Sequence, residues 1–323
     1  MKRALVLIAA ALTACGGSQK LTAEEASTAM PGASQAQLGT PHSGAALTAS
    51  SALSFQTAEY AADTEALAGS VNTGIGWTLG IVEAVVTTFP PTSCTGDTCV
   101  WGPGSDALDV NDWEITVTKK DTNDYTWTLQ GKSKVDPAAT WISFVSGEAF
   151  TTGVKHVGHG TLSIDLDAAA GLARKTTDPA PQSGKITGTY DNTSGRHVSV
   201  QFIGTQDDKV PTEKVNAAYQ FASATAGGDL QIATRNLTTG AELQLHSRWT
   251  DVGAGRADAS FSQPAAGAQA AVNISRSQCW DGATTLFNLT YQLTTPAFVG
   301  SGDTGVETSC VFSSAVPPTI TVP

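Results

Sequence analysis

The chain has 323 residues, of which 41% are hydrophobic and 15% charged, and its formal net charge is −11. An acidic chain without any cluster of Lys or Arg argues against binding to nucleic acids and against a polybasic contact with a membrane. The length is sufficient for one large hydrophobic core or two modest ones.

The N-terminus has the pattern of a bacterial export signal. Lys2 and Arg3 precede an apolar run from Ala4 to Leu12, which is about half of the ~20 residues that a membrane-spanning helix needs. The sequence Leu12-Thr13-Ala14-Cys15 matches the lipobox, in which the cysteine becomes an acylated N-terminus. We predict a signal peptide over residues 1–14 and a lipid anchor, with palmitate among its acyl chains, on Cys15. The alternative is an ordinary secretory signal in which Cys15 is incidental.

The residues after Cys15 predict the location and a tether. Gly16 stands where many Gram-negative lipoproteins of the inner membrane carry Asp, and by that resemblance we expect the outer membrane, with the domain periplasmic or surface-exposed. Residues 16 to about 54 are mostly small or polar and bury too little apolar surface to offset the entropy of ordering. We therefore predict a flexible tether over residues 15–54. Cleavage removes Lys2 and Arg3, which leaves 16 basic and 29 acidic residues and a net charge of −13.

The other four cysteines form an even set, which in an oxidising compartment predicts two disulfides. Cys94 and Cys99 flank the turn sequence Thr-Gly-Asp-Thr, so a local pair is expected there. Cys279 and Cys310 would then pair across a longer loop. A four-cysteine zinc site is the alternative, but a spacing of 31 residues lacks the short knuckle of such sites.

Residues 55–91 are apolar and favour helix. Thr57 is a candidate N-cap, alanines dominate the first turns, and Pro90-Pro91 ends the segment. Four glycines weaken the pattern, so two helices, a kinked helix or a buried strand are alternatives; they are Gly69, Gly74, Gly76 and Gly80. We predict a buried helix that packs with residues 92–323 as one domain.

Residues 92–323 consist of short runs in which apolar and polar side chains alternate. Trp113, Ile115 and Val117 alternate with polar residues, Asp121 to Asp124 forms a turn, and a second alternating run follows, as in a β-hairpin. The same pattern recurs along the chain: Leu162 to Leu166, Ile186 to Tyr190, Val198 to Phe202, Tyr219 to Phe221, Leu230 to Ile232, Leu243 to Trp249, Val272 to Ile274 and Phe287 to Tyr291. We expect about 10–12 antiparallel strands in a meander.

A long meander with one apolar face must curl or be covered. The prediction is therefore a mainly β fold, a barrel or curved half-barrel, with the helical segment packed against it. A transmembrane barrel is the alternative. It is opposed by the C-terminus Thr-Ile-Thr-Val-Pro323 and by strands shorter than the ~9–11 residues that cross a bilayer.

The sequence contains no motif of a known catalytic or phosphate-binding site, such as Gly-x-Ser-x-Gly, a Walker loop or His-Glu-x-x-His. His156 and His159 would point to opposite faces of a strand, which opposes a shared metal. Asp165 and Asp167 lack the rest of a calcium loop. We predict no enzyme activity, no metal and no cofactor.

The most unusual segment runs from Ser247 to Asp258. Arg248, Trp249, Arg256 and Asp258 flank a Gly-rich turn, which suggests a recognition hairpin whose guanidiniums bind an acidic group. In the alternative, which we favour, the arginines pair with the nearby aspartates across the strands. If there were an enzyme site, it would be sought at His246, Arg248 and Asp258.

Several motifs together resemble a group of uncharacterised bacterial envelope lipoproteins from about residue 55 onward: Pro90-Pro91-Thr-Ser-Cys94, Cys99-Val-Trp101-Gly-Pro103, the Trp113 strand, Ser247-Arg248-Trp249, Gly253 to Asp258, Ser277-Gln-Cys279-Trp280 and Cys310-Val-Phe312. That resemblance implies no catalytic residues. An early helix followed by a long meander also resembles the periplasmic lipoprotein carriers, whose curved sheet shelters acyl chains.

Two functions follow as expectations. The first is a non-enzymatic envelope lipoprotein with a structural or protein-interaction role, whose partners are the membrane and an envelope protein. The second is a carrier of a lipid or other hydrophobic ligand in the concave face of the sheet. An interior filled by Trp113, Trp127, Trp249 and residues 71–86 would favour the first.

Overall fold

The computed structural model describes residues 20–41, 59–105, 109–177, 180–206, 210, 212–224, 227–267, 270–280, 286–293, 308 and 310–323. The predicted signal peptide, residues 15–19 and 42–54 of the predicted tether with Cys15, and the candidate N-cap Thr57 lie outside these ranges.

The described helices are α1 (Ala23–Ala29), the 3₁₀ turn η1 (Ala33–Gln35), α2 (Glu59–Thr88) and α3 (Leu166–Ala169). The strands are β1 (Ser93–Thr95), β2 (Thr98–Gly104), β3 (Asn111–Asp121), β4 (Asp124–Ser133), β5 (Ile142–Thr151), β6 (Gly158–Asp165), β7 (Lys185–Asp191), β8 (His197–Gln206), β9 (Lys214–Ala224), β10 (Gly227–Asn236), β11 (Glu242–Thr250), β12 (Gly255–Gln263), β13 (Val272–Trp280) and β14 (Leu286–Leu293).

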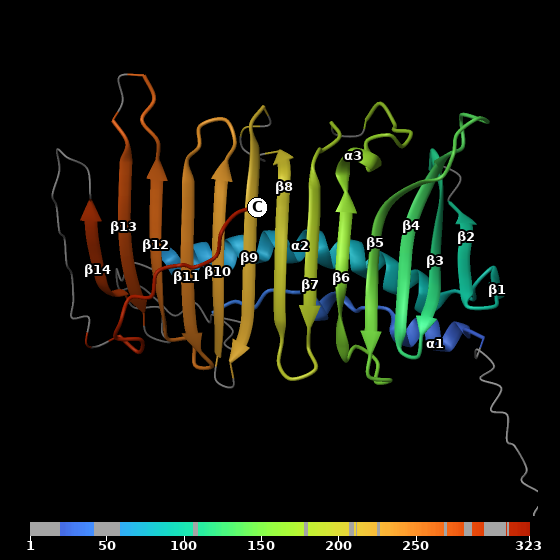
Figure 1. Cartoon of the computed structure of the whole chain (residues 1–323), viewed down its shortest axis with the longest axis horizontal. Helices are drawn as coiled ribbons and strands as arrows, with labels where there is room; N and C mark the ends of the chain where they lie inside the picture. Colours follow the sequence, from blue (N-terminus) through green and yellow to red (C-terminus); the bar gives the residue numbers. More distant parts are fainter. Residues whose placement is uncertain are drawn as a thin grey trace, which may run out of the picture.

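The strands form one antiparallel sheet in sequence order from β1 to β14 (Figure 1). The prediction of a mainly β meander with an N-terminal helix is confirmed. The sheet has 14 strands, more than expected, and it is open, because its order ends at β1 and β14 as edges. The strands do not close into a barrel. The apolar face of the sheet is covered by α2 instead.

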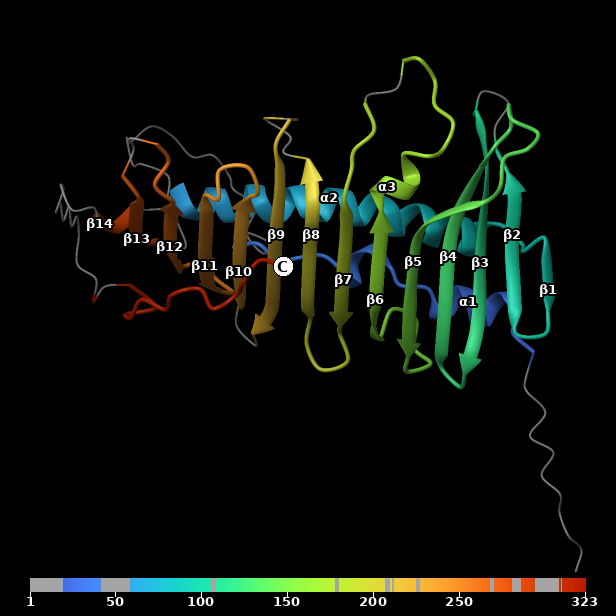
Figure 2. The same ribbon diagram turned by 45° about the horizontal axis from the view of Figure 1, so that its top comes forward.

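The helix α2 crosses one face of the sheet, nearly perpendicular to the strands, from the level of β12 to that of β3 (Figures 1 and 2). We call this the inner face and the opposite one the outer face. The predicted buried helix is therefore present, as one continuous helix of 30 residues. Nine side chains of α2 are buried: Ala61, Thr64, Ala68, Val71, Ile75, Thr78, Leu79, Val82 and Val86.

The inner face of the sheet is dense with aromatic and branched side chains. Trp127, Tyr125 and Trp280 are almost completely buried, and Trp249 stacks on Phe221 with ring centroids 6.1 Å apart. Burying each large side chain contributes roughly 1.5–3 kcal/mol, so this face and α2 together supply the core. The alternation seen in the sequence places polar side chains on the outer face.

The structure differs from the predicted tether over residues 20–41. Leu21, Ala26, Met30 and Leu38 are all buried, and the amide of Asn72 in α2 bonds the N–H and the C=O of Leu38 at 2.6 and 2.9 Å. The small and polar side chains of this segment had predicted a flexible tether. Small side chains instead let this segment lie close against the inner face.

A partly buried charge cluster fixes α1 to the sheet. The Glu25 carboxylate accepts bonds from Lys119 Nζ at 2.6 Å and from the Tyr125 hydroxyl at 2.8 Å. Burial alone would raise the pKa of Glu25, but these two donors lower it below its ordinary value of 4.5. The N-terminal segment is therefore part of the domain.

Both predicted disulfides are present, Cys94–Cys99 and Cys279–Cys310. The first staples β1 to β2. The second joins β13 to the C-terminal segment, residues 310–323, which we call the tail. In Figures 1 and 2 the tail crosses the outer face from β13 toward β9, on the side of the sheet opposite α2. Within the described ranges, no helix is long and apolar enough to cross a membrane.

Candidate functional site

Polar side chains of the outer face stand in a row that runs across the strands. The strand register places each member opposite the next, on seven successive strands from β12 to β6. We call this set the polar row: Asp258, His246, Gln231, Gln220, Ser199, Thr189 and Thr161. Its β10–β12 part lies under the tail, and its β6–β9 part does not.

The tail is held through its backbone. Val316 N–H donates to Asp258 at 3.0 Å, and Val316 O lies 2.9 Å from His246 Nδ1. Further along, Gln231 Oε1 accepts the N–H groups of Thr319 and Ile320 at 2.9 and 3.2 Å. The polar row therefore binds an extended polypeptide by its main chain, which any sequence could offer.

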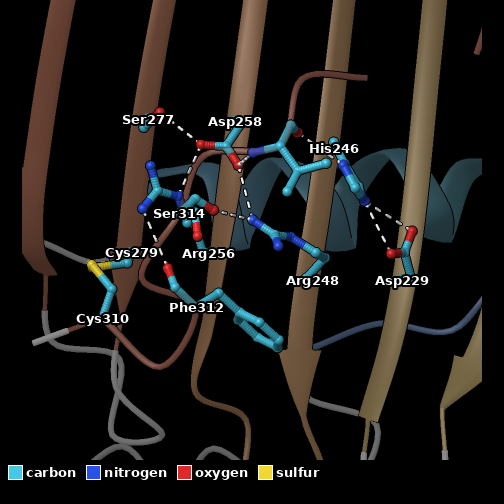
Figure 3. A network of polar contacts seen from close by, with 11 residues as sticks. Asp229, His246, Arg248, Arg256, Asp258, Ser277, Cys279, Cys310, Phe312 and Ser314 are labelled. Carbon is cyan, nitrogen blue, oxygen red and sulfur yellow. Dashed lines mark hydrogen bonds and ion pairs between the residues drawn. A yellow bond between two sulfur atoms is a disulfide. The ribbon is translucent and has the colours of Figure 1, made fainter. Parts of the chain in front are cut away.

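Asp258 is the centre of this contact (Figure 3). It is 5% exposed and accepts bonds from Arg256 Nε at 2.9 Å, Arg248 Nη2 at 3.1 Å and the Ser277 hydroxyl at 2.6 Å. Arg256 and Arg248 also donate to the tail carbonyls of Phe312 and Ser314, at 3.3 and 2.9 Å. One carboxylate thus orders two guanidiniums that point at tail carbonyls.

His246 bridges the tail to β10. Its Nε2 lies 3.0 Å from both carboxylate oxygens of Asp229, and its Nδ1 faces Val316 O. Since a carbonyl oxygen only accepts, Nδ1 is the donor in the bond to Val316 O. His246 is 4% exposed, because the tail covers it.

The structure brings together three of the four residues of the hypothesised recognition hairpin. Arg248, Arg256 and Asp258 lie side by side on the outer face (Figure 3), whereas Trp249 is 5% exposed on the inner face. The guanidiniums bind Asp258 and the chain's own carbonyls. Arg248 of β11 pairs with Asp258 of β12 across the strands, as in the alternative to an open acid-binding hairpin, whereas Arg256 pairs with Asp258 within β12.

The part of the polar row beyond the tail lines a groove of about 620 Å³. Gln220, Thr189 and Thr161 are exposed there. The groove is lined by Phe150, His159, Gly160, Thr161, Thr189, Tyr190, Asp191, His197, Val198, Ser199, Gln220, Phe221, Ala222, Asp229 and Gln231. Gln231 therefore belongs both to the groove and to the contact with the tail. The sequence did not reveal the groove, because the groove forms only when the register of six strands brings its lining residues together.

Ionisable and aromatic groups form one side of the groove. Phe150 stacks on His159 with ring centroids 4.7 Å apart. The backbone N–H and then the hydroxyl of Thr193 hold the pKa of Asp191 below its ordinary value, with smaller contributions from His159 and His197. Asp191 is therefore an ionised acceptor at neutral pH. Across the described ranges, no three His, Cys, Asp or Glu side chains are placed to hold a metal ion.

The paired histidines of the sequence are separated in the structure. His156 Nε2 lies 3.1 Å from Glu83 of α2, whereas His159 lines the groove on the outer face. Asp165 caps α3 by accepting from Ala168 N–H at 2.8 Å and pairs with Lys185 at 2.9 Å. His156 and Asp165 therefore both have partners within the fold.

Comparison with known proteins gives no match: no family model, no curated protein and no solved structure is similar to this chain.

Proposed function

We propose that the chain is an envelope lipoprotein, anchored by acyl chains on Cys15 to the outer membrane, that binds another envelope protein through the outer face of its sheet. The role is one of interaction, and it involves no enzyme activity. The resemblance to envelope lipoproteins and the lipobox support the anchor and the location. The outer face supports the interaction.

The observation that carries the proposal is the continuity between the tail contact and the groove. Gln231 bonds two backbone N–H groups of the tail, and its neighbour in the polar row, Gln220, has the same amide and no tail above it. A second extended segment in the groove would meet the same kind of donors and acceptors. Hydroxyls and amides can both donate and accept, as a peptide backbone requires.

Other functions have less support. His246, Arg248 and Asp258, where an enzyme would be sought, are engaged with one another or with tail backbone. The carrier function needs space on the inner face, but Trp127, Trp249, Ile75 and Leu79 are buried there as members of one hydrophobic cluster. A co-purifying lipid of several hundred daltons, detected by native mass spectrometry, would support the carrier function instead.

The proposal is tested by selecting 12-residue peptides from a displayed library on the immobilised full chain and measuring their affinity by fluorescence anisotropy. We expect Gln220→Ala to weaken binding by about tenfold, as the loss of one well-placed hydrogen bond does. The matched control is Thr128→Ala, on the outer face of β4 and outside the groove. Failure to select any saturable binder, or equal affinity for both variants, would reject the groove as the site.

A further inference from the structure

The exposed side of α2 is apolar and uncharged over its C-terminal half. Trp77 is 70% exposed, Ile81 37% and, just after the helix, Phe89 61%. With the exposed Ala84 and Thr88, positions 77, 81, 84 and 88 follow the spacing of a single helical stripe. Large apolar side chains gathered on one surface mark a contact with another molecule or a membrane.

Charge is absent from this stripe and present elsewhere on α2. Between Ala66 and Phe89 the one acidic residue is Glu83, which is half-buried and pairs with His156. Glu59 and Asp63 are exposed at the other end of the helix. At a rise of 1.5 Å per residue, Asp63 lies roughly 39 Å along the axis from Phe89. The two halves of α2 therefore present different surfaces.

The chain enters the domain at the apolar end of α2. Leu21 N–H donates to Gly96 O at 3.1 Å, and Trp101 Nε1 donates to Phe89 O at 2.9 Å, so both contact the β1–β2 hairpin. Residues 20–41 pack on the domain, so the link between the anchor and the domain consists of the five peptide steps from Cys15 to Lys20. They span at most about 18 Å. A lipid on Cys15 would hold this end of α2 against the membrane.

We propose that Trp77, Ile81 and Phe89 rest in the interfacial layer of the membrane that holds the acylated Cys15. This inference depends on the lipid anchor of the proposed function. Trp is favoured at the level of the headgroups, and an apolar helix face lies in that layer with its axis along the surface. The acidic end of α2 is then farther from anionic lipid. The outer face and its groove point away from the bilayer, toward a protein partner.

The test uses the full lipidated chain in vesicles of phosphatidylethanolamine and phosphatidylglycerol, with and without phospholipid brominated in its acyl chains. Trp77 is the one exposed tryptophan among those whose burial is described. Its emission is obtained by subtracting the fluorescence spectrum of Trp77→Phe from that of wild type. We expect brominated lipid to remove at least half of that emission. The matched control is Trp77→Phe with Val252→Trp, because Val252 is 66% exposed in the β11–β12 turn; its emission should be unchanged.

Equal fractional quenching of wild type and Trp77→Phe, on protein whose mass includes acyl chains, would overturn the contact. So would quenching of the Val252→Trp residue as strongly as Trp77. If the mass shows no acyl chain on Cys15, the anchor of the proposed function fails. Quenching of Trp77 by the same vesicles would then still support the membrane contact, and its absence would overturn both.

Discussion

The imidazole of His246 on β11 lies 2.9 Å from the carbonyl oxygen of Val316, although 70 residues separate them in the chain. Replacing His246 by Leu removes this bond and the bond to Asp229, at a cost of about 1–3 kcal/mol. We expect faster hydrogen exchange of residues 314–320, measured by mass spectrometry. The control is Gln244→Leu on the same face of β11, whose amide contacts Ser260. Equal exchange in both variants would contradict the role of His246.

Asp258 should be the most sensitive polar position of the outer face. Asp258→Asn keeps the shape but removes the charge that faces Arg256, which is 2% exposed, and Arg248. Removing one partner of a buried ion pair costs about 3–5 kcal/mol. Ser277→Ala removes one bond to the same carboxylate and should cost about 1 kcal/mol. Urea unfolding would measure both, and similar losses would argue against the central role of Asp258.

The two disulfides should differ in their contribution to stability. In the chain-entropy account, the Cys279–Cys310 bond, with a separation of 31 residues, stabilises by about 3–4 kcal/mol, and the Cys94–Cys99 bond, with a separation of 5, by about 2 kcal/mol. Double Ser variants of each pair would show this in urea unfolding. The Cys279–Cys310 variant alone should also expose the tail to protease. Protease cleavage of the tail in both variants would contradict the pinning of the tail by Cys310.

Docking of α1 should weaken in acid. Because the folded-state pKa of Glu25 is below its ordinary value, its bonds to Lys119 and Tyr125 stabilise α1 fully above that ordinary value. The stabilisation is lost as pH falls through the lowered pKa. The protection factors of residues 23–30, which are exchange rates corrected for the intrinsic pH dependence of amide exchange, should therefore fall on acidification in wild type. In Glu25→Gln these protection factors should be low and independent of pH in that range. The exposed Glu24 is the control, since Glu24→Gln should behave as wild type.

Alternation of apolar side chains predicted most strands, and β12 shows why it missed others. The inner-face residues of β12 are Gly255, Ala257 and Ala259, which are small because aromatic rings fill the space: a Cβ on Gly255 would lie 2.4 Å from Trp280. Its outer-face residues, Arg256 and Asp258, are buried under the tail. A strand with small inner and charged outer residues has no periodic apolar signal.

The tail and the groove were beyond sequence reasoning for a different reason. Val-Pro-Pro-Thr near the C-terminus indicates an extended chain, but nothing local shows which surface it crosses. Gln231 and Gln220 become neighbours only through the register of β9 and β10. Likewise, the burial of Leu21 and Met30 depends on α2 and the sheet, which the composition of residues 20–41 does not reveal.

The central claim is that the outer face binds another envelope protein at the groove. The most direct test places a photo-crosslinking amino acid at Ser199, in the groove, or at Thr128, on the outer face outside it, in the full chain expressed in cells. We predict a discrete protein adduct from Ser199 that Gln220→Ala weakens, and none from Thr128. The absence of a protein adduct at Ser199, or equal adducts from both positions, would contradict the claim.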